Sequence, residues 1–171
     1  MLDRLLASPP KILRRLFCHE LGAAPPTTLG LVAGVYVLSP LAMGPPGRAH
    51  GGAVITICTD VMGYLVHREG GGPLMSNTVS LEVEYLGATP LSAPVIAVSR
   101  VVGIDGRLAT TKAVLWDADA FFSLPNPYED CWLVARSTTP RSPRSPRPII
   151  TATATWVPHR QLDTTVSKSK L

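Results

Sequence analysis

A glycine- and proline-rich segment followed by a long apolar run constrains this chain more than any other feature. Residues 44–52 read Gly-Pro-Pro-Gly-Arg-Ala-His-Gly-Gly, in which the Pro-Gly pairs favour turns. The apolar run covers residues 53–67, and three glycines at 70–72 end it. Its length favours a helix of about four turns, although its many β-branched residues leave a strand open. Because the run is apolar nearly all round, we expect the helix to be buried on most sides.

One stripe of the expected helix is polar. Its members recur at the three- and four-residue spacing that brings side chains to one helix face, and they are Thr56, Thr59, Asp60 and Gly63. On one interpretation the threonines bond back to the preceding turn and Asp60 reaches solvent. On the other, the stripe lines a site below the helix start, where Gly51 and Gly52 leave backbone N–H groups approachable by a carbonyl oxygen or an anion.

Segments typical of β-strands lie before and after this helix in the sequence. Within residues 78–85, alternation predicts that Val79 and Tyr85 point to one side of the strand, and Thr78 and Glu84 to the other. An Asp-Gly pair at 105–106 is a hairpin turn signal between two of the strands. The five expected strands are residues 29–38, 78–85, 94–102, 108–116 and 151–157.

These features together resemble the hot-dog-fold thioesterase superfamily. The resemblance rests on Pro-Pro-Gly-x-Ala-His-Gly-Gly-Ala at 45–53, the buried helix, and a strand that ends in Tyr85 with Pro90-Leu91 five residues beyond it. It covers roughly residues 30–118 and 149–158, and it is closest to the acyl-CoA thioesterase branch with a His-Gly-Gly motif. It implies an α+β hot-dog fold, with a long central helix wrapped by an antiparallel sheet of about five strands.

Composition divides the chain into one domain with extensions. We expect an N-terminal amphipathic helix and linker at 1–28, a hot-dog domain at 29–158 and a tail at 159–171. The N-terminal helix packs across a sheet edge or over a substrate channel on one interpretation. On the other, its basic face touches a membrane surface or serves as an organelle address.

Residues 119–149 interrupt the hot-dog pattern as an insertion with a Pro-Arg-Ser repeat. Repeated proline and like charge resist packing into a core, so we expect 136–148 to be disordered and dispensable. The insertion is a solvated loop, a docking or phosphorylation segment, or a segment foreign to the native protein, such as a translated intron. Trp132 and the Phe121-Phe122 pair are candidates to anchor part of it.

Composition also limits which kinds of binding partner, cofactor and cellular location we expect. The net charge of +4 comes mainly from the N-terminal segment and residues 136–147, so nucleic acid is not an expected partner. No apolar run is long enough to span a membrane, and no metal-ligand spacing or cofactor motif is present. Three cysteines favour a reducing, cytoplasmic location. Only 16% of residues are charged, which favours surface buried in a homodimer or homotetramer.

The resemblance implies a site for a thioester at the start of the helix. Amides of Gly51 or Gly52 would stabilise the oxyanion formed when water attacks the carbonyl. Thr78 matches the strand hydroxyl that positions water or the carboxylate. His50 matches the motif histidine, which shapes the loop and lies near the thioester. A carboxylate, usually from the facing subunit, would activate water or attack directly.

The sequence departs from the family pattern at that carboxylate. The matching position, nine residues after His50, is Thr59, and Asp60 follows about 100° further around the helix. Gly44 also replaces the Asn or Gln of many relatives. We therefore carry two hypotheses. The first is hydrolysis of an acyl-CoA or carrier-bound acyl or polyketide thioester, with Asp60 as the base or nucleophile. The second is a non-hydrolytic protein that binds such a ligand or assists release or cyclisation in a specialised metabolic pathway.

Overall fold

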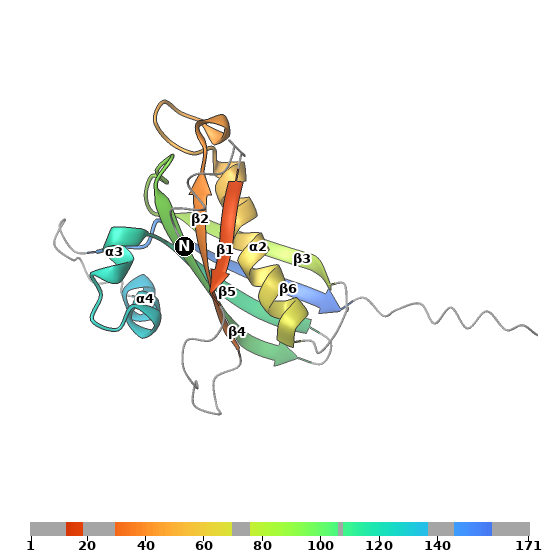
Figure 1. Cartoon of the computed structure of the whole chain (residues 1–171). Helices are drawn as coiled ribbons and strands as arrows, with labels where there is room; N and C mark the ends of the chain where they lie inside the picture. The colour runs from red at the N-terminus through yellow and green to blue at the C-terminus, as the bar shows by residue number, and fades with distance from the viewer. Residues whose placement is uncertain (1–12, 19–29, 70–75, 106–107, 137–145, 159–171) are drawn as a thin grey trace, which may run out of the picture.

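The computed structural model describes residues 13–18, 30–69, 76–105, 108–136 and 146–158. These residues form one antiparallel sheet of six strands in the order β1-β2-β4-β5-β6-β3, with the long helix α2 across one face (Figure 1). The strands are β1 (Leu13–Cys18), β2 (Leu31–Leu38), β3 (Ser76–Tyr85), β4 (Pro94–Asp105), β5 (Leu108–Asp117) and β6 (Ile150–Pro158), and the helices are the short 3-10 helix η1 (Pro40–Ala42), α2 (Gly51–Glu69), α3 (Ala118–Phe122) and α4 (Pro127–Arg136). The predicted hot-dog fold is confirmed.

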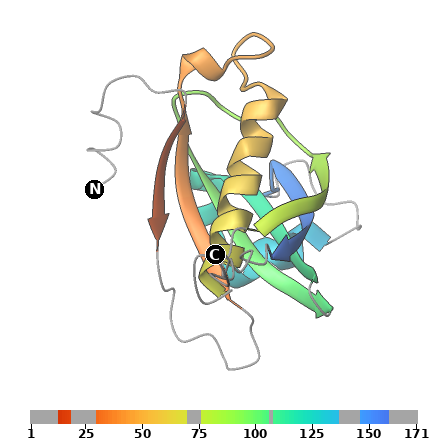
Figure 2. The same cartoon turned by 90° about the vertical axis from the view of Figure 1, so that its right-hand side faces the viewer.

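Helix α2 forms the centre of the molecule, as the apolar run predicts. It lies between the β1–β2 edge and the β3–β6 edge of the curved sheet (Figure 2). Its buried side chains, among them Ile57, Val61 and Leu65, pack against the inner face of the sheet. Strand alternation supplies that face, because Val95 and Ala97 of β4 point to the helix. The helix is therefore fixed along its length, which positions its polar stripe.

A turn brings the chain into α2. Arg48 N–H donates to Pro45 O at 3.0 Å, and Gly44 N–H donates to Arg48 O at the same distance. Gly47 lies inside this turn at a φ of 73°, in the left-handed region that glycine occupies without strain. The Pro-Gly segment thus ends as a closed turn directly before His50.

The N-terminal prediction is wrong for the part that the structure describes. Leu13–Cys18 was expected to be helical, but it forms strand β1, which pairs antiparallel with β2 from Leu13 opposite Leu38 to Cys18 opposite Ala33. A segment this short is marginal as a helix. The edge of β2 offers a row of backbone hydrogen-bond partners, which favours a strand instead. The rest of residues 1–28, and the tail, lie outside the described residues.

The insertion 119–149 is helical in part, which differs from the interpretation as a solvated loop. Of its expected anchors, Phe121 and Trp132 pack against the sheet, whereas Phe122 is exposed. Asp117 Oδ1 accepts hydrogen bonds from the N–H groups of Asp119 and Ala120, which caps α3. Helices α3 and α4 then cover the outer face of the sheet, opposite α2 (Figure 1). Phe121, Cys131 and Trp132 pack there in a second core with outward-facing residues of β2, β4 and β5. Most of the Pro-Arg-Ser repeat, at 137–145, lies outside the described residues.

Candidate functional site

The start of α2 is held by hydrogen bonds that the sequence pattern did not reveal. His50 occupies the cap position: its Nδ1 accepts from Gly52 N–H at 3.0 Å. The backbone of His50 donates to Ala42 O at 2.7 Å, and its carbonyl accepts from the N–H of Ala53 and Val54. The expectation of two bare amides is therefore wrong for Gly52, whose N–H is occupied by the motif histidine.

Gly51 retains the open amide. Its N–H makes no hydrogen bond to any residue in the described part of the chain. Its carbonyl accepts from the Tyr85 hydroxyl at 3.1 Å. Partial burial raises the pKa of Tyr85 above its usual value, so the phenol keeps the proton that it donates. Among the first-turn donors, Gly51 N–H is the one placed to meet an anion or a polarised carbonyl.

The polar stripe of α2 lines an open groove of about 570 Å³ between the helix and the β3–β6 end of the sheet. Thr56, Thr59, Asp60 and Gly63 all face it, as the second interpretation of the stripe predicts. The other side comes from Thr78 of β3 and Trp156 of β6. The full lining is Thr56, Thr59, Asp60, Gly63, Tyr64, His67, Ser76, Thr78 and Trp156.

The first interpretation of the stripe also holds for its threonines. Thr56 Oγ1 donates to Gly52 O at 2.9 Å, and Thr59 Oγ1 lies 3.1 Å from the carbonyl oxygens of both Ile55 and Thr56. These hydroxyls satisfy themselves within the helix. Thr59 therefore offers neither a base nor a readily available donor at the position where the resemblance implies a carboxylate.

Asp60 is oriented by a buried tyrosine. The hydroxyl of Tyr36, on β2, donates to Asp60 Oδ2 at 3.1 Å, and Tyr36 is fully buried in the core under α2. This hydrogen bond holds one of the two carboxylate oxygens of Asp60 in place against the strand beneath the helix. Sequence reasoning missed Tyr36, because it assigned residues 29–38 only as a strand. A tyrosine among aliphatic residues there was the available signal.

A β-bulge turns Thr78 into the groove. Pairing of β3 with β6 runs regularly from Tyr85 to Ser80, skips Val79, and resumes with Thr78 opposite Trp156. The extra residue reverses the side to which the following residues point. Val79 is consequently 61% exposed, whereas the alternation pattern placed it on the side of Tyr85, away from Thr78. The prediction that Thr78 belongs to the site is consistent with the groove, but its strand parity was predicted wrongly.

Trp156 forms a rigid wall of the groove. Its indole Nε1 donates to Thr111 Oγ1 at 2.8 Å in the buried core, which fixes the ring. A Cβ added at Gly63 would lie 3.5 Å from Cη2 of Trp156. Gly63 therefore lets helix and indole approach closely, and a large side chain there would press on the ring.

The thiols and metal-ligating side chains of the described residues limit what other chemistry the protein offers. Burial raises the pKa of the Cys58 and Cys131 thiols to about 12, which makes both poor nucleophiles at neutral pH. In the described residues no three His, Cys, Asp or Glu side chains gather in a way that could hold a metal ion. None of the described helices is long and apolar enough to cross a membrane.

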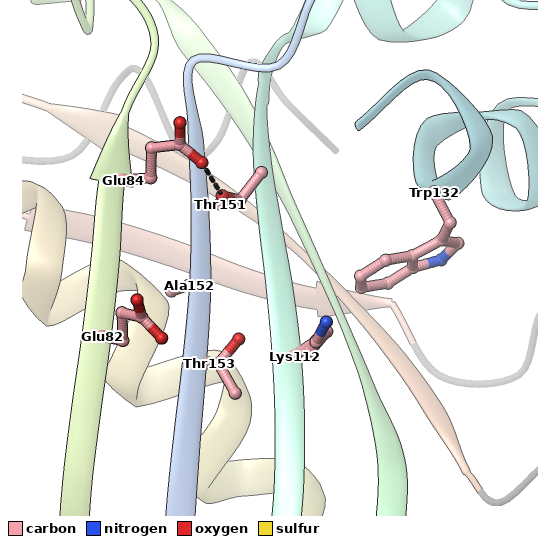
Figure 3. A pocket seen from close by; sticks show the side chains of 7 residues that line it. All are labelled: Glu82, Glu84, Lys112, Trp132, Thr151, Ala152 and Thr153. Atoms are coloured by element: carbon pink, nitrogen blue, oxygen red, sulfur yellow. Dashed lines mark hydrogen bonds between the residues drawn. The ribbon is translucent and has the colours of Figure 1, made fainter. Parts of the chain in front are cut away.

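A second hollow, of about 270 Å³, lies on the outer face of the sheet (Figure 3). Glu82 and Glu84 reach it from β3, Lys112 from β5, and Trp132 from α4. Thr151 Oγ1 donates to Glu84 Oε2 at 3.4 Å. None of the predicted site residues lines this hollow. It lies on the opposite face of the sheet from the groove beside α2.

A protein-family model matches the central part of the chain. Residues 46–120 match the model described as the thioesterase superfamily. This match covers the helix start, all of α2, and strands β3 to β5. A search of curated proteins finds no matching sequence.

Solved structures resemble the fold over about three quarters of the chain. A hypothetical thioesterase from Streptococcus pneumoniae TIGR4, solved with coenzyme A, is 18% identical with a TM-score of 0.56, over 75% of this chain and 81% of that one. The smu.793 protein of Streptococcus mutans UA159, bound to acetyl-CoA, is 17% identical with a TM-score of 0.56, over 77% and 83%. The PaaI protein of E. coli, from the phenylacetic acid degradation operon, is 7% identical with a TM-score of 0.56, over 77% and 75%.

Proposed function

We propose that this chain, which has the hot-dog fold and matches the thioesterase superfamily over residues 46–120, is a thioester hydrolase. Its substrate is an acyl-CoA or a carrier-bound acyl or polyketide chain. One observation carries the proposal: Asp60 and Thr78, from different elements, line the same groove beside the helix that presents Gly51 N–H. The bound coenzyme A and acetyl-CoA of the two streptococcal proteins favour the acyl-CoA form of the substrate.

In the proposed reaction the thioester oxygen lies at Gly51 N–H. The Asp60 carboxylate removes a proton from water, and the resulting hydroxide attacks the carbonyl carbon. Negative charge gathers on the carbonyl oxygen, where the Gly51 amide stabilises it. The carbon–sulfur bond then breaks, and the leaving thiolate takes the proton that Asp60 removed from water, which regenerates the Asp60 carboxylate. Thr78 holds the attacking water, and Tyr36 keeps the Asp60 carboxylate oriented.

The separation of Gly51 and Asp60 along α2 supports a site that is built from two copies of the chain. Gly51 and Asp60 are nine residues apart on α2, which is about 13.5 Å along a helix. One thioester group does not reach both, since reacting atoms must approach to about 3–3.5 Å. We therefore propose a homodimer, in which Gly51 of one subunit and Asp60 of the other meet across the interface. A homotetramer would be built from two such dimers.

Hydrolysis of a panel of acyl-CoAs, followed by release of the free thiol, tests this proposal. Asp60→Asn keeps the size of the side chain and removes the base, so kcat should fall by about 10² to 10⁴. Asp105→Asn is the matched control, because Asp105 is exposed at the end of β4, away from the groove. An active wild-type protein whose rate survives Asp60→Asn would contradict the role of Asp60.

A second candidate function is non-hydrolytic binding of an acyl or polyketide-like ligand. Thr59 favours it, because the family's carboxylate position here holds a hydroxyl that is bonded to the helix backbone. This candidate predicts that acyl-CoA binds without turnover and that Asp60→Asn changes nothing. Thr59→Asp restores the family's position and should then raise the hydrolysis rate above that of the wild type.

A further inference from the structure

Two successive peptide groups at the start of α2 are held in different ways. The carbonyl of the His50–Gly51 peptide accepts from the N–H groups of Ala53 and Val54, as the helix requires. The Gly51–Gly52 peptide is held at both ends by side chains. Tyr85 Oη donates to its carbonyl at 3.1 Å, and His50 Nδ1 accepts from its N–H at 3.0 Å. Gly51 lies between these two peptides.

These hydrogen bonds restrict the backbone of Gly51, which would otherwise be flexible. Glycine has the widest choice of backbone conformations, so an amide on Gly51 at a helix end would tend to fluctuate. Donors that stabilise a transition state contribute most when their direction is fixed beforehand. Hydrogen bonds on both sides of Gly51 remove its freedom and leave its own N–H as the open donor.

The same contacts explain why both positions are glycine. A Cβ at Gly51 would lie 3.1 Å from Tyr85 Oη, and a Cβ at Gly52 would lie 3.1 Å from His50 Nδ1. Both distances are tighter than ordinary van der Waals contact. A side chain at either position would therefore push away the atom that holds the Gly51–Gly52 peptide.

We propose that Tyr85 and His50 are positioning residues that clamp the Gly51–Gly52 peptide and so aim Gly51 N–H at the thioester oxygen. The clamp joins the last residue of β3 to the cap of α2. This inference rests on the proposed hydrolase activity for its kinetic consequence, but the clamp itself is a structural claim. Neither residue touches the reacting atoms in this role; both act through the backbone.

Kinetic variants test the clamp in an active protein. Tyr85→Phe removes one hydroxyl and should lower kcat about tenfold, less than the 10² to 10³ assigned to complete loss of an oxyanion donor. KM should change little, because the lost stabilisation belongs to the transition state. Tyr128→Phe, which removes a hydroxyl from α4 on the far face of the sheet, is the matched control and should keep the wild-type kcat.

His50 is tested by loss and rescue. His50→Ala removes the acceptor and should lower kcat, whereas His50→Asn should restore most of it, because an asparagine oxygen caps the same amide. Unchanged kcat in Tyr85→Phe, or equal losses in His50→Ala and His50→Asn, would overturn the clamp. Melting temperatures of all variants separate these effects from unfolding.

A measurement without substrate separates the clamp from the proposed function. The hydrogen bond between Gly52 N–H and His50 Nδ1 should give a nitrogen–nitrogen scalar coupling in NMR spectra of the wild type. Exchange of the Gly52 amide should be faster in His50→Ala than in His50→Asn. If these signals are present and hydrolysis is absent, the clamp stands and the hydrolase proposal fails. If the coupling is absent, the clamp fails whatever the activity.

Discussion

At the residue scale, the adjacent pair Thr59 and Asp60 shows how one position changes what a helix offers. Thr59 bonds to carbonyls one turn back, and Asp60 instead meets the hydroxyl of Tyr36. Successive helical residues point about 100° apart. A carboxylate at position 60 therefore meets different neighbours from one at position 59. Tyr36 is the neighbour that donates to it from the strand beneath the helix.

Tyr36→Phe tests this partnership. The variant removes the hydroxyl that donates to Asp60 Oδ2 and keeps the ring in the core. Hydrogen bonds to charged groups are worth about 1.5–3 kcal/mol, so we expect kcat to fall roughly tenfold or more. Steady-state hydrolysis with the preferred acyl-CoA measures it. A wild-type rate in this variant would show that Asp60 acts without Tyr36.

At the element scale, periodicity predicted what depends on local pattern. The long apolar run became α2, and the five expected strands became β2 to β6. Hydrogen bonds between distant residues have no such pattern. Tyr85 to Gly51 and Tyr36 to Asp60 join residues 34 and 24 positions apart, so no spacing rule reveals them. The strand at Leu13–Cys18 was missed for the same reason, since it depends on the free edge of β2.

The bulge in β3 carries a sharp prediction. Thr78 pairs opposite Trp156 and Ser80 opposite Thr155, with Val79 extra between them. Deleting Val79 therefore leaves both pairs and the side of Thr78 unchanged, and fold and activity should be retained. Deleting Glu82 instead shifts Leu81 off the core face, so the free energy of unfolding should fall by about 2 kcal/mol or more. Urea unfolding compares the two deletions, and equal losses would contradict the bulge.

The structure of the insertion leads us to expect that deleting it destabilises the protein, which differs from what its composition suggests. Helices α3 and α4 cover Ile96, Val114 and Trp116 on the outer face of the sheet. Deleting residues 120–148 uncovers these side chains, so we expect a lower melting temperature and aggregation. Composition predicts that residues 136–148 are dispensable, and this deletion removes both helices as well. Deleting only 138–144 keeps both helices and is the control. A full deletion as stable as the control would show that the second core contributes nothing.

At the scale of the whole molecule, the sheet separates two surfaces. The inner face holds α2 and the groove, and the outer face holds the second core and the hollow beside Trp132. In the homodimer proposed above, the second subunit would approach from the groove side, because the groove lies on the inner face and α3 and α4 pack on the outer face. The open edge strand β3, with Val79 and Tyr85 exposed, borders that side.

Shared sites between subunits are tested by mixing two inactive variants. Gly51→Pro removes the one N–H proposed to meet the oxyanion, and proline suits the first position of a helix. A Cβ at this position would lie 3.1 Å from Tyr85 Oη, so melting temperatures check that the variant folds. Asp60→Asn removes the base.

In a mixed dimer, one site carries both lesions and the other carries neither, because Gly51 and Asp60 of each site come from different subunits. Equal mixing after unfolding and refolding should therefore restore roughly a quarter of the wild-type rate. If both groups came from one subunit, every site would carry one lesion and no activity would return.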